Sequence, residues 1–370
     1  MHTEPNPGSS PVAFRVNGPQ GDRMDKKLVY WLEELGAVHR ELVGKKCANL
    51  GELTQIGMPV PRGFCLSVEA QRLFLEETGV RNKIVALVEH EGAPHDLKQY
   101  ADMSGRLREL VETTPPPSWL VEEVGTAYER LSRLCGADCA VAVRSAGTES
   151  HPGQYETYLN VSGPEAVIAH VLKVWSSALN DRTLAALDRQ GLVPRDSPAI
   201  GVAVIEIIPA RASGVGFTCD PSTGATTHVF LEAAWGLGEA IVAGLINPDR
   251  FVVRKETLAI EETYVGDKRL RVVLAATGTV EEETPTELRA IPSLSTPEAI
   301  RIAQLAIQLE EHFGRPQDLE WCVSEDGDFP ENVFLLQTRP ARAAASKRPP
   351  DLQQLQREAM RKIQNMLKSN

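Results

Sequence analysis

The spacing of the apolar residues changes part-way along the chain, and this change limits the folds that the chain can adopt. Between residues 107 and 131, apolar side chains recur with the 3.6-residue period of an amphipathic helix. From residue 139 on, short continuous apolar runs replace that period, at 139–143, 200–208, 214–218, 229–231 and 251–253. Helix-like stretches at 164–189 and 297–312 lie between the runs. We therefore expect an α+β protein with a largely antiparallel sheet in its second half.

Three breaks divide the chain. Residues 1–25 are rich in Pro and Gly and have no apolar period, which is typical of a flexible arm. A turn-forming stretch at 191–194 indicates a boundary between two subdomains, 26–195 and 196–341. Residues 342–370 have the pattern of a linker followed by an amphipathic helix. Two interpretations of that helix stay open: its apolar stripe packs on the chain's own body, or it docks on another subunit.

The excess of acidic over basic residues narrows the classes of molecule that the chain could bind. The chain has 39 Lys and Arg against 50 Asp and Glu, and its net charge of −11 disfavours general binding to nucleic acids or anionic membranes. A local basic pocket is still compatible with this charge. No apolar run reaches the roughly 18 residues of a spanning helix, and the N-terminus has no secretory signal pattern. The six scattered cysteines are typical of reduced thiols, so we expect a cytoplasmic protein with no nucleic-acid or membrane partner.

Two basic positions lie where a phosphate group could bind. Gly44, Lys45 and Lys46 stand just before a helical pattern, and the backbone N–H groups of a helix start can bind phosphate together with a lysine. Lysine pairs are also common on solvated surfaces, so this pattern is weak by itself. Arg144 directly follows the buried run 139–143. An arginine held at the end of a strand is suited to bidentate phosphate contact.

The segments 316–321 and 334–340 have the pattern of two strands of one hairpin. In that pairing Glu320 and Gln337 meet on one face, where their oxygens could bind a hard cation such as Mg²⁺. Arg339 lies two residues beyond Gln337 and therefore points to the same face. This group is typical of a Mg-nucleotide site, and the alternative is an exposed sheet surface with salt bridges.

Eight sequence blocks follow one another along residues 28–340: Gly-Lys-Lys with Leu-Gly-Glu, Val-Pro-Arg-Gly-Phe, Ala-Val-Arg-Ser, Glu-Thr-Tyr-Leu-Asn-Val, Ser-Gly-Val-Gly-Phe-Thr, Trp-Gly-Leu-Gly-Glu, Asn-Pro-Asp-Arg-Phe and Gln-Thr-Arg-Pro. In this order they resemble the ATP-binding domain of the phosphoenolpyruvate synthase and pyruvate phosphate dikinase family. The resemblance implies an ATP-grasp fold. Such a fold has an N-terminal α/β subdomain and a C-terminal, mainly antiparallel-sheet subdomain, with the nucleotide bound between them.

The resemblance also implies roles for individual residues. Lys46 stands at the position of the family's nucleotide-binding lysine, and Arg144 at that of a phosphate-contacting arginine. Glu320 and Gln337 fall on the magnesium-binding positions, and Arg339 falls on the arginine that grips the triphosphate. The implied cofactors are ATP and Mg²⁺, and the implied catalytic residues are Lys46, Arg144 and Arg339.

Further positions complete the implied nucleotide pocket. Glu239, in the Trp-Gly-Leu-Gly-Glu block, matches a residue at the pocket, and Glu206 and Ile208 belong to the hinge whose backbone meets adenine. Two positions depart from the family pattern, since Lys45 replaces a glycine and Ile205 replaces a glutamine that is common beside the hinge. These departures are the best support for a non-catalytic regulatory scaffold.

Family enzymes continue into a swivelling domain with a phosphorylated histidine, and none of the eight histidines here lies in such a setting. We therefore expect an ATP-dependent phosphotransferase subunit of dikinase type. It would cleave Mg-ATP to AMP and phosphate and pass the β-phosphoryl group to a histidine-bearing partner subunit. A separate chain of this kind resembles the second (β) subunit of phenylphosphate synthases, which implies phenol as the final acceptor. The alternatives are a split pyruvate- or antibiotic-directed phosphotransferase and the regulatory scaffold.

Overall fold

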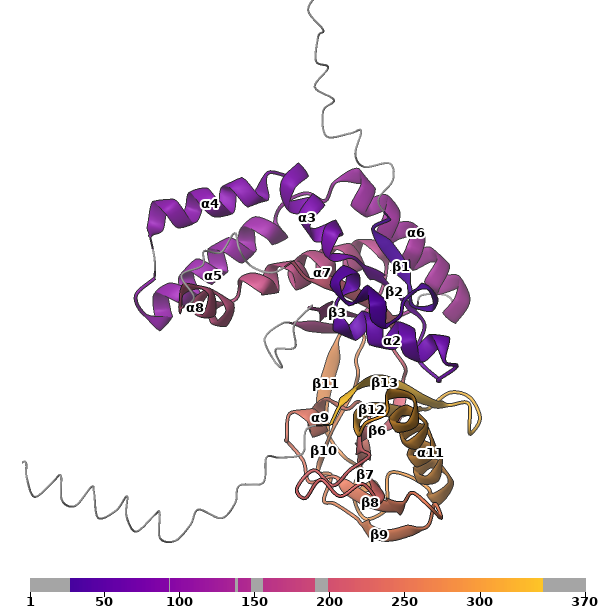
Figure 1. Ribbon diagram of the computed structural model, residues 1–370. Helices are drawn as coiled ribbons and strands as arrows, with labels where there is room; N and C mark the ends of the chain where they lie inside the picture. The colour runs from indigo at the N-terminus through magenta and orange to yellow at the C-terminus, as the bar shows by residue number, and fades with distance from the viewer. Residues whose placement is uncertain (1–26, 93, 137–138, 148–155, 190–198, 342–370) are drawn as a thin grey trace, which may run out of the picture.

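The computed structural model describes residues 27–341, except for residue 93 and the segments 137–138, 148–155 and 190–198. The expected flexible arm and the expected closing helix lie outside the described residues. The described chain forms two subdomains, each built on its own sheet, which lie one above the other in Figure 1. None of the helices within these described ranges is long and apolar enough to cross a bilayer.

The N-terminal subdomain has a five-stranded sheet with the order β1-β2-β5-β3-β4. Its strands are β1 (Val29–Trp31), β2 (Gly63–Leu66), β3 (Val141–Ala146), β4 (Thr157–Val161) and β5 (Gly201–Glu206). Every pairing between them is antiparallel, which corrects the expected α/β subdomain, since α/β folds are built on parallel strands. The central strands β3 and β5 are buried on both faces, and this explains their continuous apolar sequences.

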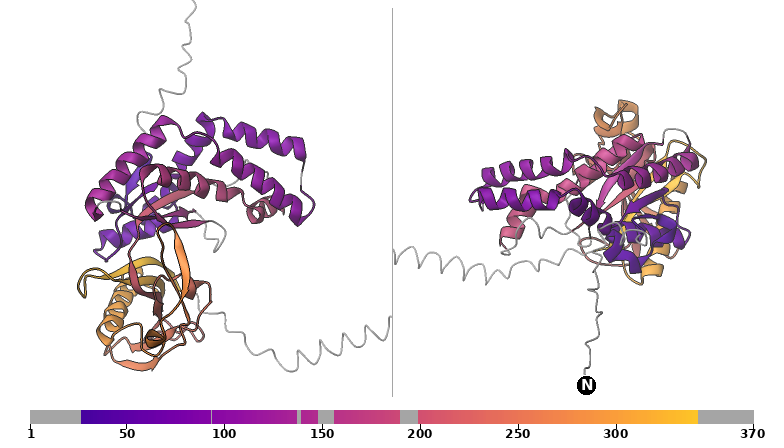
Figure 2. Two further views of the ribbon diagram at one scale, coloured as in Figure 1. Left: turned by 180° about the vertical axis from the view of Figure 1, so that it is seen from behind. Right: turned by 90° about the horizontal axis from the view of Figure 1, so that it is seen from above.

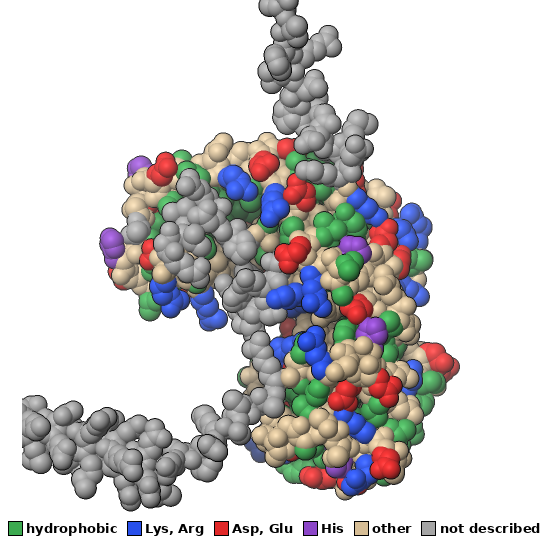
Figure 3. All heavy atoms as spheres, in the orientation of Figure 1, with side chains coloured by type: hydrophobic (Ala, Val, Ile, Leu, Met, Phe, Trp, Pro, Cys, Tyr) green, Lys and Arg blue, Asp and Glu red, His purple; other side chains and the backbone are tan. Residues whose placement is uncertain are grey.

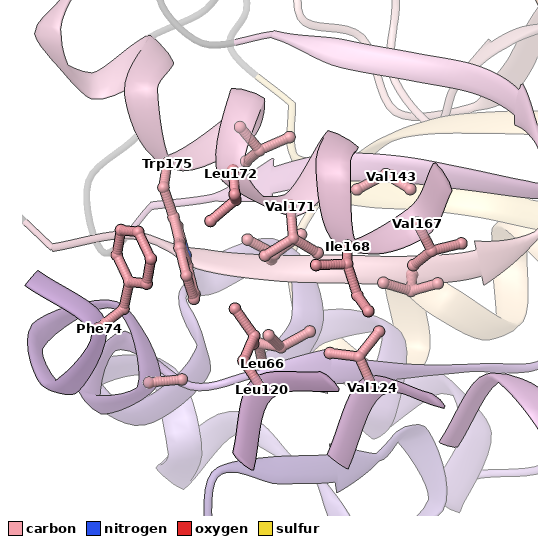
Figure 4. Packing of buried hydrophobic residues seen from close by; sticks show 14 of the residues in the cluster. Leu66, Phe74, Leu120, Val124, Val143, Val167, Ile168, Val171, Leu172 and Trp175 are labelled. Atoms are coloured by element: carbon pink, nitrogen blue, oxygen red, sulfur yellow. The ribbon is translucent and has the colours of Figure 1, made fainter. Parts of the chain in front are cut away.

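Helices cover one face of this sheet and form a hydrophobic core with it (Figure 4). Those that contact the sheet are α3 (Val68–Glu77), α6 (Ser118–Cys135) and α7 (Pro164–Ser176), while α4 (Val80–Glu91), α5 (Leu97–Glu112) and α8 (Asp181–Arg189) pack on other helices and extend away from the strands in Figure 1. Helix α7 supplies the centre of the core, because Val167, Val171 and Trp175 recur at helical spacing and are buried. Trp175 packs on Phe74 of α3, with 5.2 Å between the ring centroids.

Two short helices, α1 (Arg40–Val43) and α2 (Lys45–Gln55), lie beyond the other face of the sheet. Leu53 of α2 belongs to one apolar cluster with Ile205 of the first sheet and with Trp321 and Leu335 of the second sheet. This cluster joins the two subdomains, and Figure 1 shows α2 at their junction. The helix that carries Lys46 is therefore packed between two sheets.

The C-terminal subdomain has a six-stranded antiparallel sheet with the order β13-β12-β6-β7-β8-β9, which confirms the expected antiparallel second half. Its strands are β6 (Ala210–Phe217), β7 (His228–Trp235), β8 (Asp249–Arg254), β9 (Ile260–Tyr264), β12 (Gln317–Ser324) and β13 (Val333–Pro340). Helix α11 (Thr296–Phe313) packs on one face of this sheet. Ser295 and Glu298 form a capping box at its start.

A separate two-stranded hairpin, β10 (Leu270–Leu274) and β11 (Thr279–Glu283), extends from the C-terminal subdomain toward the N-terminal one (Figures 1 and 2). The short helix α10 (Thr286–Arg289) follows it in the sequence, and the short helix α9 (Glu239–Val242) lies between β7 and β8. The expected boundary after residue 195 would place β5 in the second subdomain, whereas β5 is the central strand of the first sheet. We propose that the subdomain boundary lies at 207–209, between β5 and β6.

Candidate functional site

Lys46 lies in the first turn of α2, and the backbone before it fixes where that helix begins. Gly44 has a φ of 81°, and a Cβ atom at this position would lie 1.9 Å from the carbonyl oxygen of Ala146. Only glycine permits both the dihedral and the approach. The N–H of Lys45 donates to the carbonyl of Gly147 at 3.0 Å. The start of α2 is thus held beside the end of β3. Gly44 makes this turn by itself, so the turn does not need the second glycine whose place Lys45 takes.

A chain of hydrogen bonds joins β3 to the β12–β13 hairpin. Glu320 pairs with Gln337 in the register of the two strands, which confirms that these residues meet. Gln337 donates from Nε2 to Glu320 Oε1 at 3.3 Å, and Arg144 donates from Nη2 to Gln337 Oε1 at 3.2 Å. Because Arg144 belongs to the first sheet and the other two residues belong to the second, the chain crosses from one subdomain to the other.

Arg339 is held by Asp318, a residue that the sequence analysis did not single out. The two residues face each other across the hairpin, and Arg339 donates from Nε to Asp318 Oδ2 at 2.6 Å. Asp318 is buried, whereas the Arg339 side chain is 54% exposed and so accessible to a ligand. A sequence signal for Asp318 was available, because it precedes Glu320 by two residues and strand periodicity puts both carboxylates on one face.

Lys46 shares this region with three charged side chains. The pKa of Lys46 is lowered to about 8, first by burial and then by the positive charges of Arg144 and Arg339, whereas the Glu320 carboxylate acts in the opposite direction. The contacts of Arg144 with Gln337 and of Gln337 with Glu320 bring the two strands' side chains together, and the charges of Arg144, Glu320 and Arg339 act on Lys46. Nε of Arg144 is buried and has no hydrogen-bond partner among the described residues. Three cationic side chains with an unpaired buried donor form a site suited to a polyanion.

Figure 3 shows how this cluster relates to the whole surface. Lys and Arg side chains gather where the two subdomains meet, although the chain as a whole carries a net charge of −11. A local concentration of basic side chains, which the composition left open, is therefore present at the junction. A site of this sign would attract an anionic ligand, which the acidic remainder of the surface would not.

An apolar patch continues along the same face of the β12–β13 hairpin. Cys322, Phe334 and Leu336 pack there with Ile208 of the hinge segment and with Leu237. The hairpin face is therefore charged at one end and apolar at the other. This division matches the two ends of a nucleotide, whose phosphates are charged and whose base is flat and largely apolar.

A β-bulge lets these apolar and polar residues share one face. The register passes from the pair Glu320–Gln337 to the pair Trp321–Leu335, which leaves Leu336 as the extra residue. Trp321 and Leu335 point into the core, where both are fully buried. Leu336 and Gln337 therefore both lie on the ligand-accessible side. A regular strand would have turned one of them away.

The hinge residues border the apolar patch, but their backbone donors are already engaged. The N–H of Glu206 donates to the carbonyl of Arg62 at 2.8 Å, and the Glu206 carboxylate accepts from the N–H of Arg62 at 3.2 Å. The N–H of Ile207 donates to the carbonyl of Ala140 at 3.0 Å. In this conformation a base beside the hinge would meet the side chain of Ile208 rather than these two N–H groups.

Glu239 lies apart from the cationic cluster. It is exposed at the start of α9, and its Oε2 accepts from the Thr279 hydroxyl at 3.1 Å. Within the described chain, no hydrogen bond or ion pair joins Glu239 to Lys46, Arg144 or Arg339. The structure connects Glu239 to the β10–β11 hairpin instead.

A family model covers most of the chain and decides what kind of domain this is. It is described as "Pyruvate phosphate dikinase, AMP/ATP-binding domain" and matches residues 40–360. The chain belongs to this family. ATP binding by such a domain accounts for a cationic cluster placed beside an apolar patch.

Relatives of this dikinase-family chain include phosphoenolpyruvate synthases. The probable phosphoenolpyruvate synthase of Staphylothermus marinus is 34% identical over 345 residues, and the alignment covers 85% of this chain and 41% of that protein. The phosphoenolpyruvate synthase of Escherichia coli is 36% identical over 335 residues, with 85% of this chain and 42% of that protein covered. The chain thus spans less than half the length of these relatives.

A solved structure of macrocyclase MdnC from Microcystis aeruginosa, bound with the precursor peptide MdnA, aligns with 68% of this chain and 66% of that chain. Its TM-score of 0.22 and its sequence identity of 10% are too low to carry an argument about the fold.

One further contact in the dikinase-family site ties α2 to β13. Asn49 donates from Nδ2 to the carbonyl of Thr338 at 3.2 Å, and Thr338 lies between Gln337 and Arg339. The helix with Lys46 and the strand with Arg339 are therefore linked directly. Sequence reasoning missed Asn49, because no local spacing relates two residues that are 289 positions apart.

Proposed function

We propose that this chain is the ATP-grasp unit of a dikinase-type phosphotransferase. It binds Mg-ATP between its subdomains, ATP and water give AMP and phosphate, and the β-phosphoryl group passes to a histidine on a partner. The observation that supports this most is the convergence of Lys46, Arg144 and Arg339, which come from α2, β3 and β13. A site assembled from both sheets suits a ligand that is held between them.

The site is cationic at one end and apolar at the other, and this difference sets the orientation in which the nucleotide would bind. The triphosphate would lie against the three cationic side chains, with the unpaired Nε of Arg144 as an additional donor. The adenine would lie on the apolar patch formed by Ile208, Phe334 and Leu336. Glu239 would border the pocket from the side of the β10–β11 hairpin.

Glu320 and Gln337 are suited to hold Mg²⁺ together with the phosphates. Their side chains are 3.3 Å apart, and a turn of the Gln337 amide would place its oxygen beside the Glu320 carboxylate. Within the described chain, no group of three or more His, Cys, Asp and Glu side chains could hold a metal by itself. That agrees with Mg²⁺, which usually takes one or two protein ligands and completes its shell with phosphate and water.

The chemistry proposed for these residues is positioning and charge stabilisation. Phosphoryl transfer needs little covalent help from the protein, and its transition state spreads negative charge over the phosphate oxygens. Lys46, Arg144 and Arg339 would neutralise that charge, and Asp318 would hold the Arg339 guanidinium in place. Fixed donors of this kind need no rearrangement during the reaction.

Calorimetric titration of the chain with Mg-ATP tests the proposal. Arg339→Ala and Glu320→Ala should each weaken binding by about 10- to 100-fold, because hydrogen bonds to charged groups contribute about 1.5–3 kcal/mol. Arg269→Ala is a matched control, since Arg269 is 78% exposed and pairs only with its neighbour Asp267 among the described residues. It should bind Mg-ATP as the wild type does. A folded wild-type chain that binds no Mg-ATP would favour the regulatory scaffold.

The final phosphoryl acceptor is a separate question. The names of the relatives favour pyruvate, whereas no described residue bears on phenol, the acceptor of phenylphosphate synthases. We propose that a histidine-bearing partner supplies both the phosphohistidine and the acceptor site. Incubation with [β-³²P]ATP and candidate partners, with pyruvate or phenol added in separate reactions, would identify the labelled histidine and the acceptor. Label retained only in ATP would contradict transfer.

A further inference from the structure

The β10–β11 hairpin is fastened at its base to the C-terminal subdomain. Lys268, just before β10, is fully buried, and its ammonium group pairs with the buried carboxylate of Asp249 at 2.5 Å. The other oxygen of Asp249 accepts from the N–H and the hydroxyl of Ser293. The N–H of Thr284 donates to the carbonyl of Arg269 at 2.8 Å and closes the base of the hairpin.

The middle of the hairpin holds the glycine-rich loop 236–239. The N–H of Leu237 donates to the carbonyl of Val272 at 2.8 Å, and a Cβ atom on Gly236 would lie only 2.3 Å from the same oxygen. The Thr279 hydroxyl donates to Glu239. The loop and the hairpin therefore have a fixed mutual position. Since Leu237 also packs against Ile208 in the apolar patch, that position sets one wall of the proposed adenine site.

The tip of the hairpin is held from the other subdomain by Asn160 of β4. Nδ2 of Asn160 donates to the carbonyl of Ala275 at 2.6 Å and to the carbonyl of Gly278 at 3.0 Å. An amide nitrogen has two hydrogens, so one side chain satisfies both acceptors. Asn160 has a φ of 57°, a left-handed conformation that asparagine tolerates better than most residues. The Glu-Thr-Tyr-Leu-Asn-Val block that contains it has no other role assigned above.

We propose that Asn160 is a positioning residue that latches the hairpin across the two subdomains and thereby sets the base-binding wall at Leu237. The inference rests on the proposed function. A two-stranded hairpin is marginally stable alone, so its place depends on the contacts at its ends. Without the contact at its tip, the hairpin keeps only the contacts at its base and its middle. Its outer part can then shift, and Leu237, which is bonded to the middle of the hairpin, shifts with it. The triphosphate contacts come from other elements and do not depend on this latch.

The test compares two ligands in one variant. Asn160→Gly removes the amide and still permits the positive φ, so the backbone is not strained. We expect its affinity for Mg-ATP to fall on the order of tenfold, as two lost hydrogen bonds would predict. Its affinity for magnesium tripolyphosphate, which has no base, should equal that of the wild type. Asn160→Asp should behave similarly, since a carboxylate cannot donate to the two carbonyls.

Controls separate this inference from the proposed function. Asn82→Ala, at an exposed position on α4, should bind both ligands as the wild type does. If Asn160→Gly binds Mg-ATP as tightly as the wild type, or loses both ligands equally, the latch is overturned while the ATP site stands. If the wild type binds neither ligand, the proposed function itself fails. Thermal melting of each variant shows that it is folded.

Discussion

Burial and neighbouring charges both change the chemistry of Lys46. A lysine in water has a pKa near 10.5, whereas burial and the two nearby arginines lower the pKa of Lys46 to about 8. It is therefore still mainly protonated at neutral pH. A bound triphosphate would bring negative charge close to it and raise its pKa again. Binding and protonation of Lys46 should thus favour each other.

This coupling predicts a pH dependence of binding. Above pH 8 the free chain has lost the Lys46 proton, so Mg-ATP affinity should fall as the pH rises from 7 to 9.5, with proton uptake on binding. Titration calorimetry in two buffers with different ionisation enthalpies measures both quantities. Lys46→Met should bind more weakly at pH 7 and lose most of the dependence. Equal wild-type affinity at pH 7 and pH 9 would contradict a pKa near 8.

Asp318 and Arg339 should act as one unit. Arg339→Ala should remove on the order of 2–4 kcal/mol of transition-state stabilisation, as the loss of other preorganised donors does. Asp318→Asn keeps the shape but removes the charge that holds the guanidinium, so it should lower kcat/KM by a smaller factor. If Asp318 acts through Arg339, the double variant should be no slower than Arg339→Ala alone. Additive losses would show that Asp318 has a separate role.

At the scale of elements, the start of α2 is tightly constrained. Gly44→Ala would combine a positive φ with a Cβ atom 1.9 Å from a carbonyl oxygen. Gly79→Ala is a matched control, since Gly79 also has a positive φ of 69° but has nothing within 4 Å of the added atom. We expect Gly79→Ala to lower the free energy of unfolding by about 1 kcal/mol and Gly44→Ala to lower it clearly more. Urea unfolding measures the difference, and equal losses would mean that β3 moves aside easily.

Local sequence patterns were sufficient to predict several helices and strands, but not how these elements contact one another. Helix α11 and the β12–β13 hairpin follow from the apolar period and from residue types that alternate along a strand. The face shared by Glu320, Gln337 and Arg339 follows from the same period. The bulge at Leu336 does not, because strand sequences rarely show where the register will shift. The latch at Asn160 does not follow either, since its partners are backbone carbonyls and any residue type can supply them.

At the scale of the whole molecule, the shared apolar cluster should make unfolding cooperative. Helix α2, both sheets and α11 contribute to it, so separating the subdomains would expose this cluster, although the N-terminal subdomain also has a core of its own. We expect one thermal transition whose calorimetric and van't Hoff enthalpies agree. Mg-ATP at 100 times its Kd should stabilise the chain by about 2.7 kcal/mol. Two resolved transitions, of which ATP shifts only one, would contradict this view.

The position of the site in the chain order was predictable only through the family resemblance. Eight blocks in one order placed Lys46, Arg144, Glu320, Gln337 and Arg339 in one site, and the structure brings these five side chains together. Strand periodicity alone grouped Glu320, Gln337 and Arg339 on one face of the hairpin, but it did not relate them to Lys46 or Arg144. The contact of Asn49 with Thr338 joins residues far apart in the sequence and has no local signal, whereas Asp318 could have been found from its spacing to Glu320.

The contact between α2 and β13 also has a consequence for synthesis on the ribosome. Asn49 and Thr338 are 289 positions apart, a distance that takes roughly 15–60 s to translate at typical rates of about 5–20 residues per second. Throughout that interval the nascent polypeptide has Lys46, which we propose binds phosphate, but not the strand with Gln337 and Arg339. On the proposed function, a prematurely terminated product that stops before β13 would lack Gln337 and Arg339 and should therefore compete less well for cellular ATP than the full chain.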